Sequence, residues 1–211
     1  MNLVLLGPPG SGKGTQGERL AAVLGVPKIA TGDVLRTAVR EGTEQGRRAK
    51  SFMDSGDLVP DDVILGIMKE ALSKDDAAGG VVLDGVVRTV AQAEGLERVL
   101  NELGRALDAV IVFDISEDEL VARLGGRTVC GSCQTPYKGR EPGSRCDKCG
   151  GTLIRRKDDE PSAVRNRMRA YREQTEPVIA WYGSNGTQLV RVDAVGEVEE
   201  VNKRIMSQLG K

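Results

Sequence analysis

The chain has 211 residues, which suits one medium-sized domain or one core with inserted pieces. Its 30 basic and 31 acidic side chains leave a net charge of −1, which argues against a nucleic acid or an anionic membrane surface as the main partner. It has no histidine, so any mechanism that needs an imidazole base, nucleophile or metal ligand is excluded. No apolar run approaches the roughly 20 residues of a membrane span, and Met1 lies almost directly before the first predicted strand. We therefore expect no signal peptide and a cytoplasmic protein, and we expect a monomer.

Short apolar runs rich in β-branched residues recur along the chain, each too short for a helix, and they predict strands. They are Asn2–Gly7, Lys28–Ala30, Val81–Asp84, Ala109–Phe113 and Gln188–Val192. Helical patterns alternate with these runs, which predicts an α/β fold with a five-stranded parallel sheet flanked by helices. Ligands of such sheets bind beyond the carboxyl ends of the strands.

The first loop, Gly7–Thr15, reads Gly-Pro-Pro-Gly-Ser-Gly-Lys-Gly-Thr and precedes a helix predicted over Gln16–Leu24. Strand, glycine-rich turn and helix are the context of a phosphate-binding loop, or P-loop, in which backbone N–H groups and the helix N-terminus face the phosphates. Lys13 would reach the outer phosphates. Gly14 stands where the general pattern has Ser or Thr, and the hydroxyl comes one residue later. The alternative is a glycine-rich turn that binds nothing.

The segment after the second predicted strand begins with Thr31, a plausible cap for a helix. Two short helices follow, predicted over Asp33–Arg40 and Thr43–Asp54, and they form a helical insert between strands. Asp84 ends the third apolar run, where a P-loop enzyme holds magnesium directly or through water. The alternative for Asp84 is a helix cap in a loop.

Helix signals also mark the rest of the chain. A helix is predicted from Pro60 to about Ser73, and Ser116–Glu119 reads as a capping box. Pro161 suits the first turn of a helix, and Pro177 is expected to kink or divide that segment. The candidate buried positions of this segment are Val164, Met168, Tyr171, Val178 and Trp181. A last helix is expected from about Glu197 to Leu209.

All four cysteines fall in a polar, glycine-rich stretch between Gly125 and Asp159. They form two Cys-x-x-Cys pairs, Cys130/Cys133 and Cys146/Cys149, separated by twelve residues. Four thiolates suit tetrahedral zinc in a closed structural site, which would replace the hydrophobic core that this insert lacks. Two disulfides, four free thiols or an iron site are the alternatives, and a cytoplasmic chain makes disulfides the weaker one. A zinc-knuckle pair also occurs in nucleic-acid-binding and protein-binding modules.

Arginines recur where the chain crosses the predicted ligand edge, and guanidinium groups match phosphate oxygens bidentately. They are Arg36, Arg88, Arg123, Arg127, Arg155, Arg156, Arg165 and Arg167. Phosphoryl transfer needs little covalent chemistry from the protein, because it depends on holding two substrates in line and neutralising charge. Arginines, a lysine and magnesium can do this without histidine.

These residues together resemble the adenylate kinases, specifically the long bacterial form whose lid binds zinc, over the whole chain. The matching segments are Gly7–Thr15, Thr31–Arg36, Gly56–Pro60, Asp84-Gly85 with Arg88, Thr89 and Gln92, Gly126-Arg127, the four cysteines, Arg156–Asp159, and Arg165 with Arg167. The resemblance implies a three-part enzyme that transfers a phosphoryl group reversibly from MgATP to AMP. The core would comprise residues 1–29, 60–125 and 160–211, the AMP-binding flap residues 30–59, and the lid residues 126–159.

The resemblance also implies roles for individual residues. The expected ATP site comprises Gly10, Ser11, Gly12, Lys13, Gly14, Thr15, Arg123, Arg127, Pro136, Tyr137 and Gly196. The expected AMP site comprises Thr31, Gly32, Arg36, Met53, Asp57, Leu58, Val59, Gly85, Val86, Val87, Arg88, Gln92, Arg156 and Arg167, with Gln92 contacting adenine. The expected catalytic residues are Lys13, Arg88, Arg123, Arg127, Arg156 and Arg167. Asp33 and Asp84 would hold Mg²⁺ through water, Cys130, Cys133, Cys146 and Cys149 would bind Zn²⁺, and Asp158 and Asp159 would pair with arginines on closure.

The chain departs from the family at one functional loop. The family usually reads Asp-Gly-Phe-Pro-Arg-Thr, with a cis peptide before the proline, whereas this chain has Val86-Val87 in place of Phe-Pro. A cis bond before Val87 would cost about 3–4 kcal/mol. We therefore predict a trans bond, a shifted loop and weaker AMP binding than in relatives.

Two alternative functions remain at this point. The first is a kinase for another nucleoside monophosphate, or one that prefers GTP as the phosphate donor. The second, of a different class, is a zinc-ribbon binding protein with a vestigial nucleotide site. The presence of Thr15, Arg36, Arg88 and Arg167 speaks against decay of the site.

Overall fold

The computed structural model describes residues 1–210, apart from the side chain of residue 45, and it contains the predicted parallel sheet. Five strands lie in the order β2-β3-β1-β4-β8, and all their pairings are parallel. The strands are β1 (Asn2–Leu6), β2 (Lys28–Ala30), β3 (Val81–Asp84), β4 (Ala109–Asp114) and β8 (Gln188–Asp193). All five predicted strands are confirmed, with ends that differ by at most one residue.

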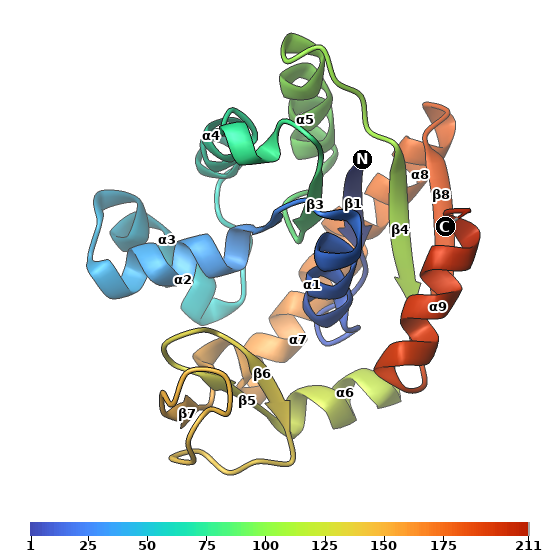
Figure 1. Cartoon of the computed structure of the whole chain (residues 1–211). Coiled ribbons are helices and arrows are strands. Elements are labelled where there is room, and N and C mark those ends of the chain that lie inside the picture. Colours follow the sequence, from blue (N-terminus) through green and yellow to red (C-terminus); the bar gives the residue numbers. More distant parts are fainter. Residues whose placement is uncertain (211) are drawn as a thin grey trace.

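Helices cover both faces of this sheet, as the alternating pattern predicted (Figure 1). The helices that pack on its faces are α1 (Lys13–Leu24), α4 (Asp61–Leu72), α5 (Val90–Glu102), α8 (Glu176–Ser184) and α9 (Val198–Gln208). Two further helices, α6 (Glu117–Gly125) and α7 (Pro161–Ala170), lie outside the apolar clusters of the sheet. Short 3-10 turns span Asp75–Ala77 and Lys157–Asp159, and a π-helical turn spans Tyr171–Thr175. No helix within residues 1–210 is both long enough and apolar enough to cross a membrane.

Strand β1 explains why the sheet needs two layers of helices. All five of its residues are buried, and successive side chains of a strand point to opposite faces. Val4 and Leu6 belong to an apolar cluster with α4, α5 and α8, whereas Leu3 and Leu5 belong to a second cluster with α1 and α9. A strand buried on both faces forms a near-continuous apolar run, which is the pattern that identified it in the sequence.

The helical insert comprises α2 (Thr31–Glu41) and α3 (Glu44–Ser55), which lie to one side of the sheet in Figure 1. Thr43 caps α3, because its hydroxyl accepts a hydrogen bond from Gly46 N. The prediction that Thr31 caps α2 is wrong. Thr31 is the first residue of the helix, and its buried hydroxyl donates instead to the carbonyl oxygen of Gly85 at 2.9 Å. This bond ties the start of the insert to the loop after β3.

The cysteine-containing insert follows α6 and forms a small antiparallel sheet in the order β6-β5-β7 (Figure 1). Its strands are β5 (Arg127–Cys130), β6 (Pro136–Lys138) and β7 (Leu153–Ile154). Its buried apolar cluster consists of Cys130, Cys146 and Leu153. So small a cluster agrees with the expectation that this segment has too few apolar side chains for a core of its own.

Two local predictions on helices need correction, and one helix signal was missed. Ser116 does cap α6 by accepting from Glu119 N, but the Glu119 side chain pairs with Arg123 and so does not complete a capping box. The sequence analysis missed the complete capping box of α9, formed by Glu197 and Glu200. Helix α1 begins at Lys13 rather than at residue 16, because the P-loop leads directly into its first turn.

The buried face of the segment from Pro161 onward was predicted only in part. Val178 is buried as expected, whereas the other four candidates, Val164, Met168, Tyr171 and Trp181, are half-buried. The remaining buried positions are Ala163, Ala170, Thr175, Ile179 and Tyr182. The π-helical turn at residues 171–175 inserts extra backbone before Pro177 and changes the helical register of the residues that follow it. A pattern read with a constant period of 3.6 residues cannot account for that shift.

Candidate functional site

A cavity of about 810 Å³ lies at the carboxyl ends of the parallel strands. Gly7 follows β1, Thr31 follows β2 and Asp84 ends β3, and all three line it. Its wall also includes the first insert, α6, β6 and α7. Each residue that the sequence analysis assigned to nucleotide or magnesium binding lines this cavity. Segments far apart in the chain therefore meet in one space.

The P-loop forms the floor of the cavity with two glycines in the left-handed region. Gly10 has a φ of +85°, and a Cβ atom there would lie 2.9 Å from Leu124 Cγ. Gly12 has a φ of +94° and is the N-cap of α1, so no side chain caps the first amides of that helix. These N–H groups carry the partial positive charge of the helix N-terminus. Such a helix end at the cavity is suited to an anion.

Gly14 has a structural reason for replacing the usual Ser or Thr. A Cβ atom at this position would lie 3.3 Å from Asp84 Oδ2, which is a tight contact. The close approach keeps the Asp84 carboxylate beside the first turn of α1. A hydroxyl at Thr15 avoids that crowding and still lines the cavity.

Lys13 is partly buried, and its side chain folds back onto the loop. Its Nζ donates to the carbonyl oxygens of Gly7 at 2.6 Å and Pro8 at 2.8 Å. Burial lowers the pKa of Lys13 to about 7; the Asp84 carboxylate opposes this shift, and the positive charge of Arg88 adds to it. The lysine is thus a cation kept at considerable cost, which a bound anion would offset.

Arginines surround the same space, and burial lowers the pKa of several of them. Arg88 is partly buried and donates from Nε to the carbonyl of Gly85 at 3.0 Å, and desolvation together with the charge of Arg167 lowers its pKa to about 10. Burial, with the charges of Arg36 and Arg127, lowers the pKa of Arg156 to about 10. Shifts of this kind on neighbouring cations favour a polyanionic ligand.

Two carboxylates balance part of this charge. Arg167 contacts Asp158 at 3.0 Å and Asp159 at 3.2 Å, and Arg127 donates from Nε to Asp159 at 2.8 Å. Arg36 lies 3.9 Å from Asp158 and also pairs with Asp33. Burial disfavours the charged form of Asp158, but Arg167 and the other arginines outweigh it and keep its pKa below the usual range. The predicted pairing of these aspartates with arginines is present.

The loop after β3 contains Val86 and Val87, the two positions at which the sequence differs from the usual Phe-Pro. Val86 and Val87 are each 1% exposed, and every peptide bond described within residues 1–210 is trans. The predicted trans bond before Val87 is therefore confirmed. Arg88 N donates to Gln92 Oε1 at 2.7 Å, which fixes the end of this loop on α5.

Gln92 has a partner that the sequence analysis missed. Its Nε2 donates to Asp61 Oδ1 at 2.7 Å, and Asp61 also accepts from Thr89 at 3.2 Å. Asp61 thus orients both the amide and the N-cap of α5. The only sequence signal for Asp61 was its place at the start of a helix, which does not distinguish it from Asp62. Each group of the Gln92 amide retains a further hydrogen-bonding position for a ligand.

The remaining predicted side chains of the ATP site already have partners. Arg123 pairs with Glu119 at 2.8 Å and donates to the carbonyl of Ala194 at 3.0 Å. Tyr137 lines the cavity, but its hydroxyl lies 3.2 Å from Cys146 Sγ. Asp33, expected near magnesium, pairs with Arg36 and lies 3.9 Å from Arg156, whereas Asp84 lies beside Gly14 as described above. Asp33 is therefore less available to a metal than Asp84.

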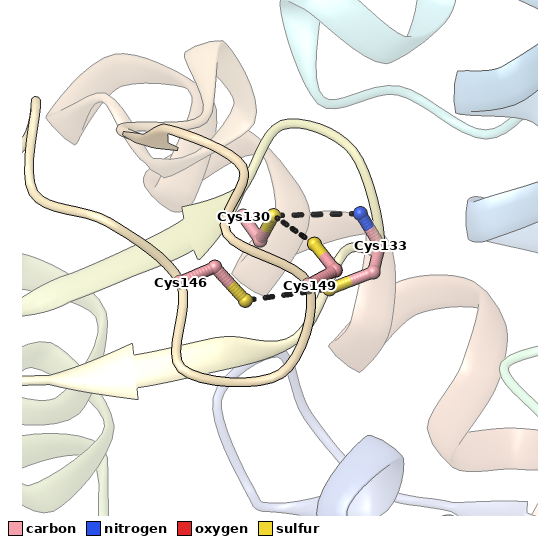
Figure 2. Close-up of side chains that lie close together, drawn as sticks. All are labelled: Cys130, Cys133, Cys146 and Cys149. Carbon is pink, nitrogen blue, oxygen red and sulfur yellow. Dashed lines mark hydrogen bonds between the residues drawn. The ribbon is translucent and has the colours of Figure 1, made fainter.

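The four cysteines converge from two turns (Figure 2): the first knuckle contains Cys130 and Cys133, and the second contains Cys146 and Cys149. Their sulfur atoms all lie within 4.8 Å of one another. The distances of 3.4 Å from Cys130 to Cys149 and 3.6 Å from Cys133 to Cys146 are too long for disulfides, and all four thiols are free. Four thiolates about 2.3 Å from a zinc ion are separated by about 3.8 Å in a tetrahedron. The arrangement fits a structural zinc ion with no open coordination position.

The comparisons with known proteins agree over the whole chain. A family model described as adenylate kinase matches residues 5–187. A protein named adenylate kinase from Gemmatimonas aurantiaca is 65% identical over 211 residues, covering 99% of each chain. Adenylate kinases from Methanothrix thermoacetophila and Archaeoglobus fulgidus are each 46% identical, covering 100% of this chain and 99% of their own. The similarity is not confined to the P-loop or to the cysteine pairs.

We predict that Lys13→Met raises the melting temperature of the ligand-free protein, most strongly at or below about pH 7. The folded state binds the Lys13 proton more weakly than the unfolded chain, whose lysine pKa is 10.5, so the charged lysine destabilises the fold at low pH. That cost fades as the pH rises from about 7 to 10.5, and the variant's advantage should fade with it. Thermal unfolding across this range, with the exposed Lys203→Met as control, measures the effect. A pH-independent difference would contradict it.

Proposed function

This chain belongs to the adenylate kinase family, and we propose how its cavity carries out the family's reaction, the reversible transfer of a phosphoryl group from MgATP to AMP to give two ADP. One observation supports the proposal above the others. The cavity brings Lys13 and partly buried arginines from the core, from both ends of the cysteine-containing insert and from α7 around a single space. Two polyphosphate chains meeting end to end supply the negative charge that this group of cations requires.

We assign the ATP side to the P-loop and the lid edge. The glycines and first amides of α1 would hold the outer phosphates together with Lys13, and Thr15 supplies the hydroxyl. Arg123 and Arg127 would contact the ATP phosphates, while Pro136, Tyr137 and Gly196 would lie against the base and ribose. Asp84 would hold Mg²⁺ through water. Asp33 would become a second partner once its ion pair with Arg36 opens. A Mg²⁺ ion held there would neutralise negative charge on the phosphates.

We assign the AMP side to the first insert and the loop after β3. Arg36 and Arg88 would bind the AMP phosphate, and Gln92 would contact adenine while Asp61 holds its amide. Met53, Asp57, Leu58, Val59, Thr31, Gly32, Gly85, Val86 and Val87 would complete the pocket. Arg156 and Arg167 would contact both substrates, which places the attacking and leaving oxygens in line.

Catalysis in this arrangement is positional and electrostatic. The arginines stabilise charge that develops on the transferred group, in a site where few waters compete. We propose that residues 30–59 move as a flap, residues 126–159 move as a lid, and the remaining residues form the core. Closure of both would exclude water and suppress hydrolysis of ATP. Asp158 and Asp159, at the base of the lid, would exchange their arginine partners as the substrates bind.

We further propose that the lid holds one structural Zn²⁺ ion on Cys130, Cys133, Cys146 and Cys149. The geometry of the sulfur cluster and the small apolar core of this insert support the assignment. We also propose a cytoplasmic monomer whose partners are ATP and AMP; the balanced net charge of −1 offers no basic surface excess for nucleic acid or an anionic membrane.

We predict that Arg167→Lys lowers kcat by roughly 100-fold or more. A lysine ammonium cannot reproduce two planar contacts, and the loss of a transition-state donor typically costs about 10²–10³ in rate. A coupled assay with a panel of monophosphates and with ATP or GTP measures both rate and specificity. Arg169→Lys, an exposed change on the same helix, is the control and should retain activity. If the unmodified protein works faster with another nucleotide pair, it is a different kinase. If the unmodified protein transfers no phosphoryl group from MgATP to AMP, the proposal is overturned.

We predict that restoring Phe-Pro at positions 86 and 87 strengthens AMP binding. Aromatic contact near the base and a tighter loop around Arg88 are the expected reasons. Titration calorimetry with AMP alone measures the change, and titration with MgATP gives the control, which should not move. If the AMP dissociation constant is the same in both proteins, the valines have no effect on the pocket.

We predict about one equivalent of bound zinc per chain, and we expect its removal to lower stability more than intrinsic chemistry. The ion cross-links two knuckles that have little apolar packing to hold them together. Metal analysis, followed by calorimetric unfolding and activity before and after chelation, separates the two effects. An immediate loss of activity with unchanged unfolding would mean that the ion is catalytic.

A further inference from the structure

Tyr137 lies between the nucleotide cavity and the sulfur cluster. It is the middle residue of β6, is paired with Thr128 of β5 and lines the cavity. It also packs against the buried cysteine cluster, and its hydroxyl lies 3.2 Å from Cys146 Sγ. Tyr137, which we expect to contact the nucleotide, therefore also directs its hydroxyl at Cys146, which we expect to bind the metal.

The direction of this hydrogen bond follows from a second contact. The backbone N–H of Asp147 donates to the Tyr137 hydroxyl oxygen at 3.0 Å. A phenol has one hydrogen, and with its oxygen already accepting, that hydrogen is free to be donated to sulfur. The Tyr137 hydroxyl thus accepts a hydrogen bond from Asp147 N and donates one to Cys146 Sγ, so both contacts connect it to the second knuckle.

Sulfur atoms of both knuckles have hydrogen-bonding partners. In the first knuckle, the N–H groups of Ser132 and Cys133 each donate to Cys130 Sγ at 3.4 Å, and Thr135 Oγ1 lies 3.1 Å from Cys133 Sγ. These contacts are local to the turn. The Tyr137 hydroxyl comes instead from strand β6 and lies 3.2 Å from Cys146 Sγ. Four thiolates around a divalent cation carry excess negative charge, so each donor to sulfur stabilises the loaded site.

The ring is held in this orientation from the other side. The Arg140 guanidinium lies 5.2 Å from the centre of the Tyr137 ring, within the range of a cation–π contact. Arg140 in turn donates to the carbonyl of Arg145 at 2.9 Å and pairs with Asp147. The hydroxyl is therefore positioned by a ring with fixed surroundings rather than by a freely rotating side chain.

We propose that Tyr137 is a positioning residue for the metal, whose hydroxyl orients Cys146 and retains the ion in the lid. This inference rests on the proposed zinc site and adds to it a residue that is not a cysteine. Loss of such an outer partner typically weakens metal affinity by about 10–100-fold. The side chain fixed by the metal also forms part of the cavity wall, so the occupied sulfur cluster sets the shape of the nucleotide cavity at that point.

Tyr137→Phe tests the proposal, because it removes the hydroxyl and keeps the ring. We expect the zinc dissociation constant, measured by competition with a chromogenic chelator, to rise about 10–100-fold in full-length Tyr137→Phe. Tyr171→Phe is the matched control, since Tyr171 also lines the cavity but lies in the π-helical turn away from the cysteines, and its zinc affinity should not change. A dissociation constant of Tyr137→Phe within twofold of the wild-type value overturns the role of the hydroxyl.

Thermal unfolding distinguishes metal positioning from simple packing. The metal-free forms of wild-type and Tyr137→Phe should melt together, and a difference should appear only after zinc is added. Equal destabilisation with and without metal overturns the proposal. The absorption spectrum of the cobalt(II) forms shows whether each protein assembles four thiolates around the metal. A weaker four-thiolate spectrum in Tyr137→Phe than in the wild type also supports the proposal. A wild-type chain that retains no zinc overturns the zinc site itself.

Discussion

Positive charge gathered at one edge of the sheet is the constraint on which the rest of the structure depends. Lys13 and Arg88 are partly buried in the wall of the cavity, and desolvation lowers the pKa of both groups. Such an arrangement is costly unless negative charge lies beside it. Within the chain, Asp158 and Asp159 provide part of that balance through Arg167 and its neighbours. The substrates of an adenylate kinase carry phosphates that complete it, so binding energy is directed to the atoms at which phosphoryl transfer takes place.

The two inserts have different physical means of reaching this edge. Helices α2 and α3 pack on each other and are joined to the core loop by the bond from Thr31 to Gly85. The cysteine-containing insert has almost no apolar interior, and a cluster of sulfur atoms stands where a hydrophobic core would be. Tyr137 contacts this sulfur cluster and also forms part of the cavity wall.

Much of the fold follows from local patterns that the sequence states clearly. The five apolar runs became the five strands, because buried parallel strands leave little choice of composition. The P-loop and the two cysteine pairs were identifiable because backbone geometry and metal coordination demand fixed spacings. Several details of the helices were predicted incorrectly. Thr31 is not a cap, Glu119 pairs with Arg123 instead of completing a capping box, and the π-helical turn shifts the buried face of the segment that contains Pro177. Each of these depends on which partner a polar group or an apolar face finds elsewhere in the chain.

By itself, then, the sequence determined the strand set, the P-loop, the two Cys-x-x-Cys pairs and the trans bond at Val86-Val87. Local sterics and short-range spacing are sufficient for each of these features. Only the tertiary structure decided which charges lie together: that Asp61 orients Gln92, that Asp33 is paired with Arg36, and that the hydroxyl of Tyr137 is directed to Cys146. Those contacts join residues of different elements, and a hydrogen bond or an ion pair depends on a distance that no local pattern encodes.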